Sequence, residues 1–221
     1  MKGSLQSGCI GVLLVLILMS SQVFAAEGVQ VIKGPTPIPN GDAQSAQDLT
    51  LVNSKMAVAF AVETGAPWGV ARGGVLDGAV VTKNGIQLDH VTLIDFIPNN
   101  WSSWPTTYQR VEVVKESPEE AVIRTERDWG QCDLVTEYTL PKGSDRMHMK
   151  TTMTNNGDKP EKDILSGYVL WCTGGSHFGP AGLAGREEGS REGTMSDWSV
   201  TYDRGWAVTI HAPYFDHFDY D

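Results

Sequence analysis

Two adjacent segments, Cys132–Leu140 (CDLVTEYTL) and Met147–Met153 (MHMKTTM), decide the fold class of this chain. Every second residue of the first segment is apolar, aromatic or a threonine, and Asp133 and Glu137 occupy the opposite parity. The second segment alternates in the same way, with methionines opposite His148. A period of two places the two sets of side chains on opposite faces of a β-sheet. The segments therefore predict two strands, each with one buried face and one polar face.

The segments on either side extend this pattern into an all-β chain. Tyr108–Lys115 (YQRVEVVK) and Ala121–Glu126 (AVIRTE) alternate around a Ser-Pro-Glu-Glu turn, and glycine-containing turns follow at 141–145, 155–158 and 203–205. Beyond the leader, no window has the period of a helix. Strands at roughly ten-residue spacing without helices predict an antiparallel β-sandwich.

Three further segments define the outer parts of this sandwich. Ile164–Cys172 (ILSGYVLWC) is apolar on both parities, which predicts a central strand buried on both faces. Thr173–Asp197 is glycine-rich and longer than an ordinary connection. Trp206–His211 (WAVTIH) has the pattern of a last strand without a return partner. We therefore expect a sandwich that is incomplete at its C-terminus and belongs to a longer architecture.

The composition divides the chain into three parts. Residues 1–26 combine an early lysine, an apolar run and small residues ending at Ala25, which is the pattern of a signal peptide. Residues 27–48 are rich in proline and lack periodicity, so we expect an extended N-terminal segment or linker with a strand only at Val29–Ile32. Residues 49–221 form the expected sandwich domain. The leader predicts a secreted or periplasmic protein.

Charge and cysteine content restrict the partners. The net charge of −10 at pH 7 repels phosphate backbones and anionic lipids. We therefore expect no nucleic acid as a partner and, once the leader is removed, no membrane. Cleavage leaves Cys132 and Cys172, which an oxidising compartment allows to form a disulfide, and two buried free thiols are the alternative.

The best candidate ligand site is Asn99–Pro105 (NNWSSWP). Trp101 and Trp104 offer faces for stacking on sugar rings, and Asn100 offers a donor and an acceptor for hydroxyl groups. The alternative is structural, with one or both indoles covering an open end of the core.

His211 opens a second candidate segment, residues 211–221 (HAPYFDHFDYD), which concentrates histidines, acids and aromatic residues. In a functional interpretation, Asp216, His217 and Asp219 hold a divalent ion or supply a general acid or base, but their spacing fits no established metal motif. A solvated acidic edge is the structural alternative. The glycines at 179–185 lack the lysine of a phosphate-binding loop. Neither a nucleophile elbow nor a nucleophile with a base is found, so catalytic residues stay unknown. We expect no metal site and no cofactor.

Together, residues 51–69 (LVNSKMAVAFAVETGAPWG), 73–81 (GGVLDGAVV) and 135–160 (VTEYTLPKGSDRMHMKTTMTNNGDKP) resemble galactose-mutarotase-like β-supersandwich domains. Such domains occur in exported bacterial carbohydrate-active enzymes and other exported hydrolases. The resemblance covers residues 49–221 and implies a sandwich with a concave face able to hold a sugar. It carries no catalytic assignment, because the histidine and carboxylate motifs of aldose epimerases find no match here. It also implies a downstream or partner catalytic domain.

Three functions remain open on the sequence alone. The first is an ancillary or scaffold domain that binds carbohydrate. The second is a sugar-active enzyme, an epimerase, lyase or hydrolase, with histidine and aspartate acid–base residues on the concave face. The third is a cell-envelope adhesion or assembly module. Clustering of His148, His177 or His211 with an acid and Trp101 would favour the enzyme. A face paved with aromatic residues and without titratable groups would favour the first function, and a featureless concave face with long exposed edge strands would favour the third.

Overall fold

The computed structural model describes residues 28–66, 72–96, 110–128, 132–162, 167–179, 182–184 and 198–211. These residues form strands and no helix, which confirms the predicted all-β class. In chain order the strands are β1 (Gln30–Lys33), β2 (Leu49–Val52), β3 (Met56–Phe60), β4 (Val75–Thr82), β5 (Gly85–Ile86), β6 (Val91–Phe96), β7 (Arg110–Glu116), β8 (Glu120–Asp128), β9 (Cys132–Pro141), β10 (His148–Asn155), β11 (Tyr168–Cys172), β12 (Ser176–Gly179), β13 (Gly182–Ala184), β14 (Trp198–Asp203) and β15 (Trp206–His211).

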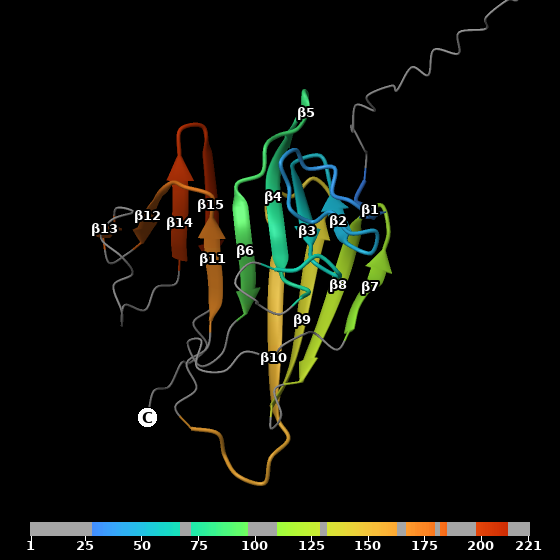
Figure 1. The fold of residues 1–221 in the computed structure, drawn as a ribbon, viewed down its shortest axis with the longest axis vertical. Coiled ribbons are helices and arrows are strands. Elements are labelled where there is room, and N and C mark those ends of the chain that lie inside the picture. Colours follow the sequence, from blue (N-terminus) through green and yellow to red (C-terminus); the bar gives the residue numbers. More distant parts are fainter. Residues whose placement is uncertain are drawn as a thin grey trace, which may run out of the picture.

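The strands are arranged in three antiparallel sheets (Figure 1). The large sheet has the order β1-β2-β3-β4-β6-β11, with β5 paired to β4. The small sheet has the order β10-β9-β8-β7 and packs against the large sheet. The C-terminal sheet has the order β13-β12-β14-β15. The predicted antiparallel β-sandwich is confirmed by the packing of the large sheet on the small sheet.

Strand pairing in the small sheet follows the alternation in the sequence. Tyr138 of β9 lies opposite Met149 of β10 on one side and Ile123 of β8 on the other. Along β9 the even-numbered residues from Cys132 to Leu140 are buried, and the odd-numbered residues are half-buried. The even-numbered set therefore faces the large sheet, and the odd-numbered set forms the outer face.

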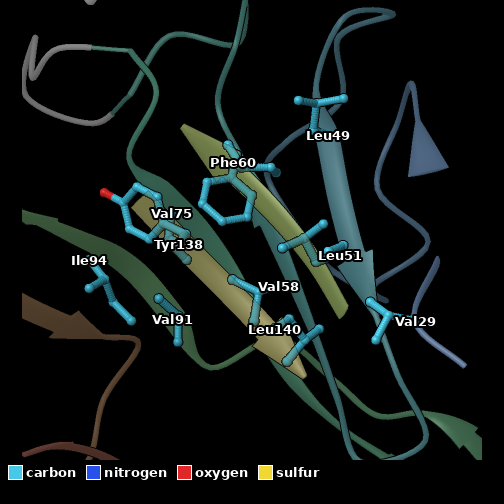
Figure 2. Packing of buried hydrophobic residues seen from close by; sticks show 12 residues of the cluster. Val29, Leu49, Leu51, Val58, Phe60, Val75, Val91, Ile94, Tyr138 and Leu140 are labelled. Atoms are coloured by element: carbon cyan, nitrogen blue, oxygen red, sulfur yellow. The ribbon is translucent and has the colours of Figure 1, made fainter. Parts of the chain in front are cut away.

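The main core lies between the large sheet and the small sheet (Figure 2). Phe60 of β3 and Tyr138 of β9 meet edge to face, with ring centroids 5.0 Å apart, and both are fully buried. Aromatic pairs in this geometry add to the free energy of burial. Aliphatic side chains of both sheets surround the two rings, namely Leu49, Leu51, Val58, Val75, Val91, Ile94, Ala121, Ile123 and Leu140.

Residues 28–48 belong to the sandwich, so the expectation of a linker is wrong for this segment. The predicted first strand is present as β1, which pairs with β2. The following loop packs on the outer face of the large sheet, where Ile38 and Ala43 are buried. Asp77 holds this loop by accepting hydrogen bonds from the backbone N–H groups of Asp42 and Ala43 at 2.6 and 3.1 Å. Such contacts leave no periodic signal in the sequence.

The prediction of a central strand for Ile164–Cys172 is also wrong, because β11 is an edge strand of the large sheet (Figure 1). Among the described residues β11 pairs with β6 alone, and all its residues are half-buried. Leu170 packs against the main core, whereas Trp171 packs against Leu76 and Leu93 on the opposite face of the sheet. Both faces of β11 carry packed apolar side chains although it has one strand neighbour in the described part of the chain, which explains the apolar residues on both parities.

The glycine-rich segment Thr173–Asp197 is more than the long connection that the sequence predicts. It contains β12 and β13, and β12 also pairs with β14. The hairpin of β14 and β15 turns at Gly205, whose φ of 90° favours glycine. On this hairpin Trp206 stacks on His90 with ring centroids 4.5 Å apart, and this contact joins the C-terminal sheet to the large sheet. In the described part of the chain β15 has no strand partner besides β14.

Candidate functional site

The predicted ligand residues lie mostly outside the described residues. Asn100, Trp101 and Trp104 belong to residues 97–109, for which the structure gives no description. The chain leaves the described structure after Phe96 and re-enters it at Arg110. The stacking role of the two tryptophans therefore stays a prediction.

The described histidine side chains lie on separate elements. His148 is exposed at the start of β10, and His211 is exposed at the end of β15. Burial lowers the pKa of His90, which stacks on Trp206, and the charge of Asp203 acts in the opposite direction. The side chain of His177 and residues 212–221 lie outside the described part. Within that part, no three His, Cys, Asp or Glu side chains are arranged to hold a metal ion.

Cys132 and Cys172 are both free thiols, so the candidate disulfide is not formed in this structure. The physical reason is their position at opposite ends of the sandwich. Cys132 begins β9 at the end where Arg127 contacts Asp95, whereas Cys172 ends β11 opposite Val91, at the other end of β6. Burial raises the pKa of Cys172 to about 11, although a hydrogen bond with Thr201 acts against it. Burial also raises the pKa of Cys132. A raised pKa disfavours the thiolate, so neither cysteine is activated as a nucleophile.

A shallow hollow opens on the outer face of the small sheet. It has a volume of about 290 Å³, and its lining comes from three neighbouring strands, with Arg124 on β8, Val135 and Glu137 on β9, and Lys150 and Thr152 on β10. Strand register explains the shape. Arg124, Glu137 and Lys150 lie opposite one another, and Val135 and Thr152 lie opposite each other on the next rung. Long side chains beside the short Val135 leave a depression with an apolar floor.

The charged side chains around this hollow differ in their ion pairing. The Nη2 atom of Arg124 forms an ion pair with Oε1 of Glu126 at 3.0 Å, but its Nε atom is buried and has no hydrogen-bond partner. Among the described residues, no ion pair involves Glu137 or Lys150. The hollow therefore presents two cationic donors, one carboxylate acceptor and the hydroxyl of Thr152 around an aliphatic floor.

Sequence reasoning placed Glu137 on the polar face of its strand but singled out none of the residues that line the hollow. The signal that identifies them is cross-strand register, which joins residues from three strands and is invisible within any one strand. Arg124 and Lys150 are far apart in the sequence and are brought to one rung by the pairing of β8, β9 and β10.

A second polar cluster is buried between the sheets near the end of β6. Arg127 of β8 contacts Asp95 of β6 at 3.1 Å, and both side chains are fully buried. The Oγ1 atom of Thr151 lies 2.8 Å from Oγ1 of Thr136 and 2.7 Å from the hydroxyl of Tyr168. Burial raises the pKa of Tyr168 to about 12. These contacts join β6 to β8 and β10 to β11, so the cluster holds the two sheets together.

Asp89 is a carboxyl group whose ionisation the fold opposes. Its Oδ1 atom accepts hydrogen bonds from the N–H groups of Gly78 at 2.7 Å and Val91 at 3.1 Å. Burial, assisted by the charges of Asp77 and Asp42, raises its pKa from 3.8 to about 7. Because the folded pKa is the higher one, the unfolded chain ionises first as the pH rises. The stability that the protonated Asp89 side chain contributes is therefore fully present below pH 3.8, the ordinary pKa of the group. It is lost as the pH rises through the folded pKa of about 7.

We expect Asp89→Asn to remove this part of the pH dependence. Asparagine keeps an oxygen that accepts both backbone hydrogen bonds and carries no charge. After allowance for solvent screening, Asp89 is expected to lower the free energy of unfolding by about 1–2 kcal/mol between pH 4 and pH 8. Urea unfolding at several pH values, followed by tryptophan fluorescence, measures the difference. Asp145→Asn, at an exposed turn position, is the control. Equal slopes for Asp89→Asn and the unmodified protein would contradict a raised pKa at Asp89.

No protein-family model, curated protein or solved structure matches this chain. Within the described residues, there is also no helix long and apolar enough to cross a membrane. The function of the chain is therefore inferred from the chemistry of its own residues.

Proposed function

We propose that the chain is an exported, non-catalytic β-sandwich domain that binds carbohydrate, as an ancillary or scaffold part of a bacterial extracytoplasmic protein. The hollow on the outer face of the small sheet is the observation that carries this proposal. A sugar ring has apolar C–H faces and a rim of hydroxyl groups that both donate and accept hydrogen bonds. Val135 supplies an aliphatic surface for the ring, and Arg124 and Glu137 supply a donor and an acceptor for its hydroxyls.

The lining of the hollow supports binding over catalysis. Among the residues that the structure describes, Glu137 is the one carboxylate that lines the hollow, and no histidine lines it. Glu126 lies beside the hollow, opposite Val135, and its carboxylate is held in an ion pair by Arg124. Hydrolysis of a glycosidic bond commonly needs two carboxyl groups in separate roles, and proton abstraction needs a positioned base and acid. The assembly-module alternative has less support, because the face is hollowed and carries charged groups at a defined position.

The purified protein is expected to bind oligosaccharides on a glycan array, and Arg124→Ala is expected to weaken this binding about tenfold or more. The reason is the loss of a charged hydrogen-bond donor, which contributes about 1.5–3 kcal/mol. Titration calorimetry with the best array ligand gives the affinity ratio. Binding to no glycan would reject the proposal.

The chain offers a matched control in Arg110→Ala. Arg110 of β7 pairs with Glu112 in the same strand, as Arg124 pairs with Glu126, but Arg110 does not line the hollow. The Arg110→Ala variant should bind the sugar as tightly as the unmodified protein does. An equal loss of affinity in Arg110→Ala and Arg124→Ala would place the sugar elsewhere. Trp101→Ala and Trp104→Ala then test whether the predicted stacking residues take part.

A further inference from the structure

We infer that the outer face of the C-terminal sheet is a second carbohydrate-binding surface, which takes a neutral glycan chain of several sugar units along β14. This inference rests on the proposed function, because it assumes a chain that binds carbohydrate, and it adds a surface on a different sheet from the hollow. Its basis is the set of side chains that the hairpin of β14 and β15 turns away from the main core (Figure 1).

The packing of this hairpin fixes which of its side chains point outward. Val208 and Ile210 of β15 pack against the main core. Thr201 of β14, which lies opposite Val208, is fully buried. Because side chains alternate along a strand, the residues of the other parity lie on the outer face. Those whose side chains the structure describes are Trp198, Val200 and Tyr202 on β14 and Ala207, Thr209 and His211 on β15.

Two aromatic residues of β14 give this face surfaces for stacking. Tyr202 is 39% exposed, and Trp198 and Val200 are half-buried. Trp198 and Tyr202 are four residues apart on one strand, which corresponds to about 13 Å. A single sugar ring is too short to cover both. The face therefore fits a chain of several rings, which stacks on an aromatic side chain at each end and contacts the aliphatic Val200 between them.

Polar side chains flank this aromatic row on the two neighbouring strands. Thr209 and His211 of β15 are exposed on one side of the row. Ser176 of β12 lies opposite Tyr202 on the other side. Hydroxyl and imidazole groups at these positions both donate and accept hydrogen bonds, as the hydroxyl groups along the rim of a sugar chain require.

The charge of the face favours a neutral glycan. One residue in five of this chain is charged, but none of the outer-face residues named above is Asp, Glu, Lys or Arg. Asp203 has the opposite parity on β14, and Arg204 lies in the turn of the hairpin. An acidic sugar would find no cation on these strands. An apolar protein surface would cover Thr209 and His211 without giving their polar atoms a partner, which costs free energy.

The test measures binding of cellohexaose, xylohexaose and mannohexaose to the whole purified protein by titration calorimetry. We expect at least one hexasaccharide to bind, and the matching disaccharide to bind about tenfold more weakly or less, because it does not reach both aromatic side chains. Trp198→Ala and Tyr202→Ala are each expected to weaken hexasaccharide binding about tenfold, whereas Tyr202→Phe keeps the ring and most of the affinity. Val114→Ala, at an exposed apolar position of β7, is the control.

Thr209→Arg gives a measurement that does not depend on how the aromatic variants fold. The site is exposed, so the substitution should leave the fold intact, and the long side chain is expected to block the row and abolish hexasaccharide binding. Unchanged affinity in Trp198→Ala, Tyr202→Ala and Thr209→Arg would overturn the inference.

Arg124→Ala separates this inference from the proposed role of the hollow. Loss of affinity in the outer-face variants, with Arg124→Ala unchanged, would support the second surface and reject the hollow. Loss in Arg124→Ala alone would overturn the inference and leave the proposed function standing. Binding of no hexasaccharide would also overturn the inference, and binding of no glycan at all would reject both proposals.

Discussion

Arg127→Met is expected to lower the free energy of unfolding by about 3–5 kcal/mol, because it leaves the charge of Asp95 buried without its cation. Both side chains are fully buried, so water does not compensate the charge. The variant also loses the hydrogen bond from Nη2 of Arg127 to the carbonyl oxygen of Phe96. Urea unfolding at neutral pH, followed by tryptophan fluorescence, measures the loss.

A double variant separates the charge from the packing. Asn at position 95 keeps an oxygen for the N–H group of Phe96, which Oδ1 of Asp95 accepts at 2.8 Å, and removes the charge. Asp95→Asn combined with Arg127→Met is therefore expected to be more stable than Arg127→Met alone. Lys142→Met breaks an exposed ion pair with Glu119 and should cost less than about 1 kcal/mol. A double variant no more stable than Arg127→Met would contradict the buried-charge explanation.

Phe60→Ala is expected to cost a further large amount, about 3–5 kcal/mol, because it empties the centre of the main core. Phe60 is fully buried between the large sheet and the small sheet and contacts Tyr138 edge to face. The substitution removes this aromatic pair and leaves a cavity. The two sheets cannot close this cavity fully, because the backbone hydrogen bonds between strands keep each sheet in its shape. The same urea measurement gives the loss.

Two further variants of the large sheet calibrate this result. Phe60→Leu keeps most of the volume and is expected to lose less stability than Phe60→Ala. Val80→Ala changes a side chain that is 53% exposed, so its effect should stay within about 0.5 kcal/mol. If Phe60→Ala were no more destabilising than Val80→Ala, the contact between the two sheets would not be what holds the sandwich.

The sequence predicted the small sheet well because one face of that sheet is buried. Cys132–Leu140 alternates in sequence, and its burial alternates with the same parity in the structure. The same reasoning failed for Ile164–Cys172, whose apolar residues cover both faces of a strand at the edge of the large sheet. Apolar residues on both parities report that both faces are covered, but they carry no information about the number of strand neighbours.

The structure of residues 28–48 and of the described part of residues 173–197 was harder to predict from the sequence, for a second reason. Asp77, far along the chain, holds the loop before β2 through the backbone N–H groups of Asp42 and Ala43. β12 is a strand because it pairs with β13 and β14, and its four residues lie in a glycine-rich segment that has no alternation of its own. Long-range hydrogen bonds of this kind involve residues with no local pattern, so local periodicity does not predict them.

By itself, the sequence determined the all-β class, the strands of the small sheet and the polarity of its two faces, since these depend on a local period of two. Only the tertiary structure decided which strands lie at the edges, that Cys132 and Cys172 belong to different sheets, and that Arg124, Glu137 and Lys150 share one rung around Val135. The physical reason is that register and sheet order are set by contacts between distant segments. The hollow exists only after those contacts have formed.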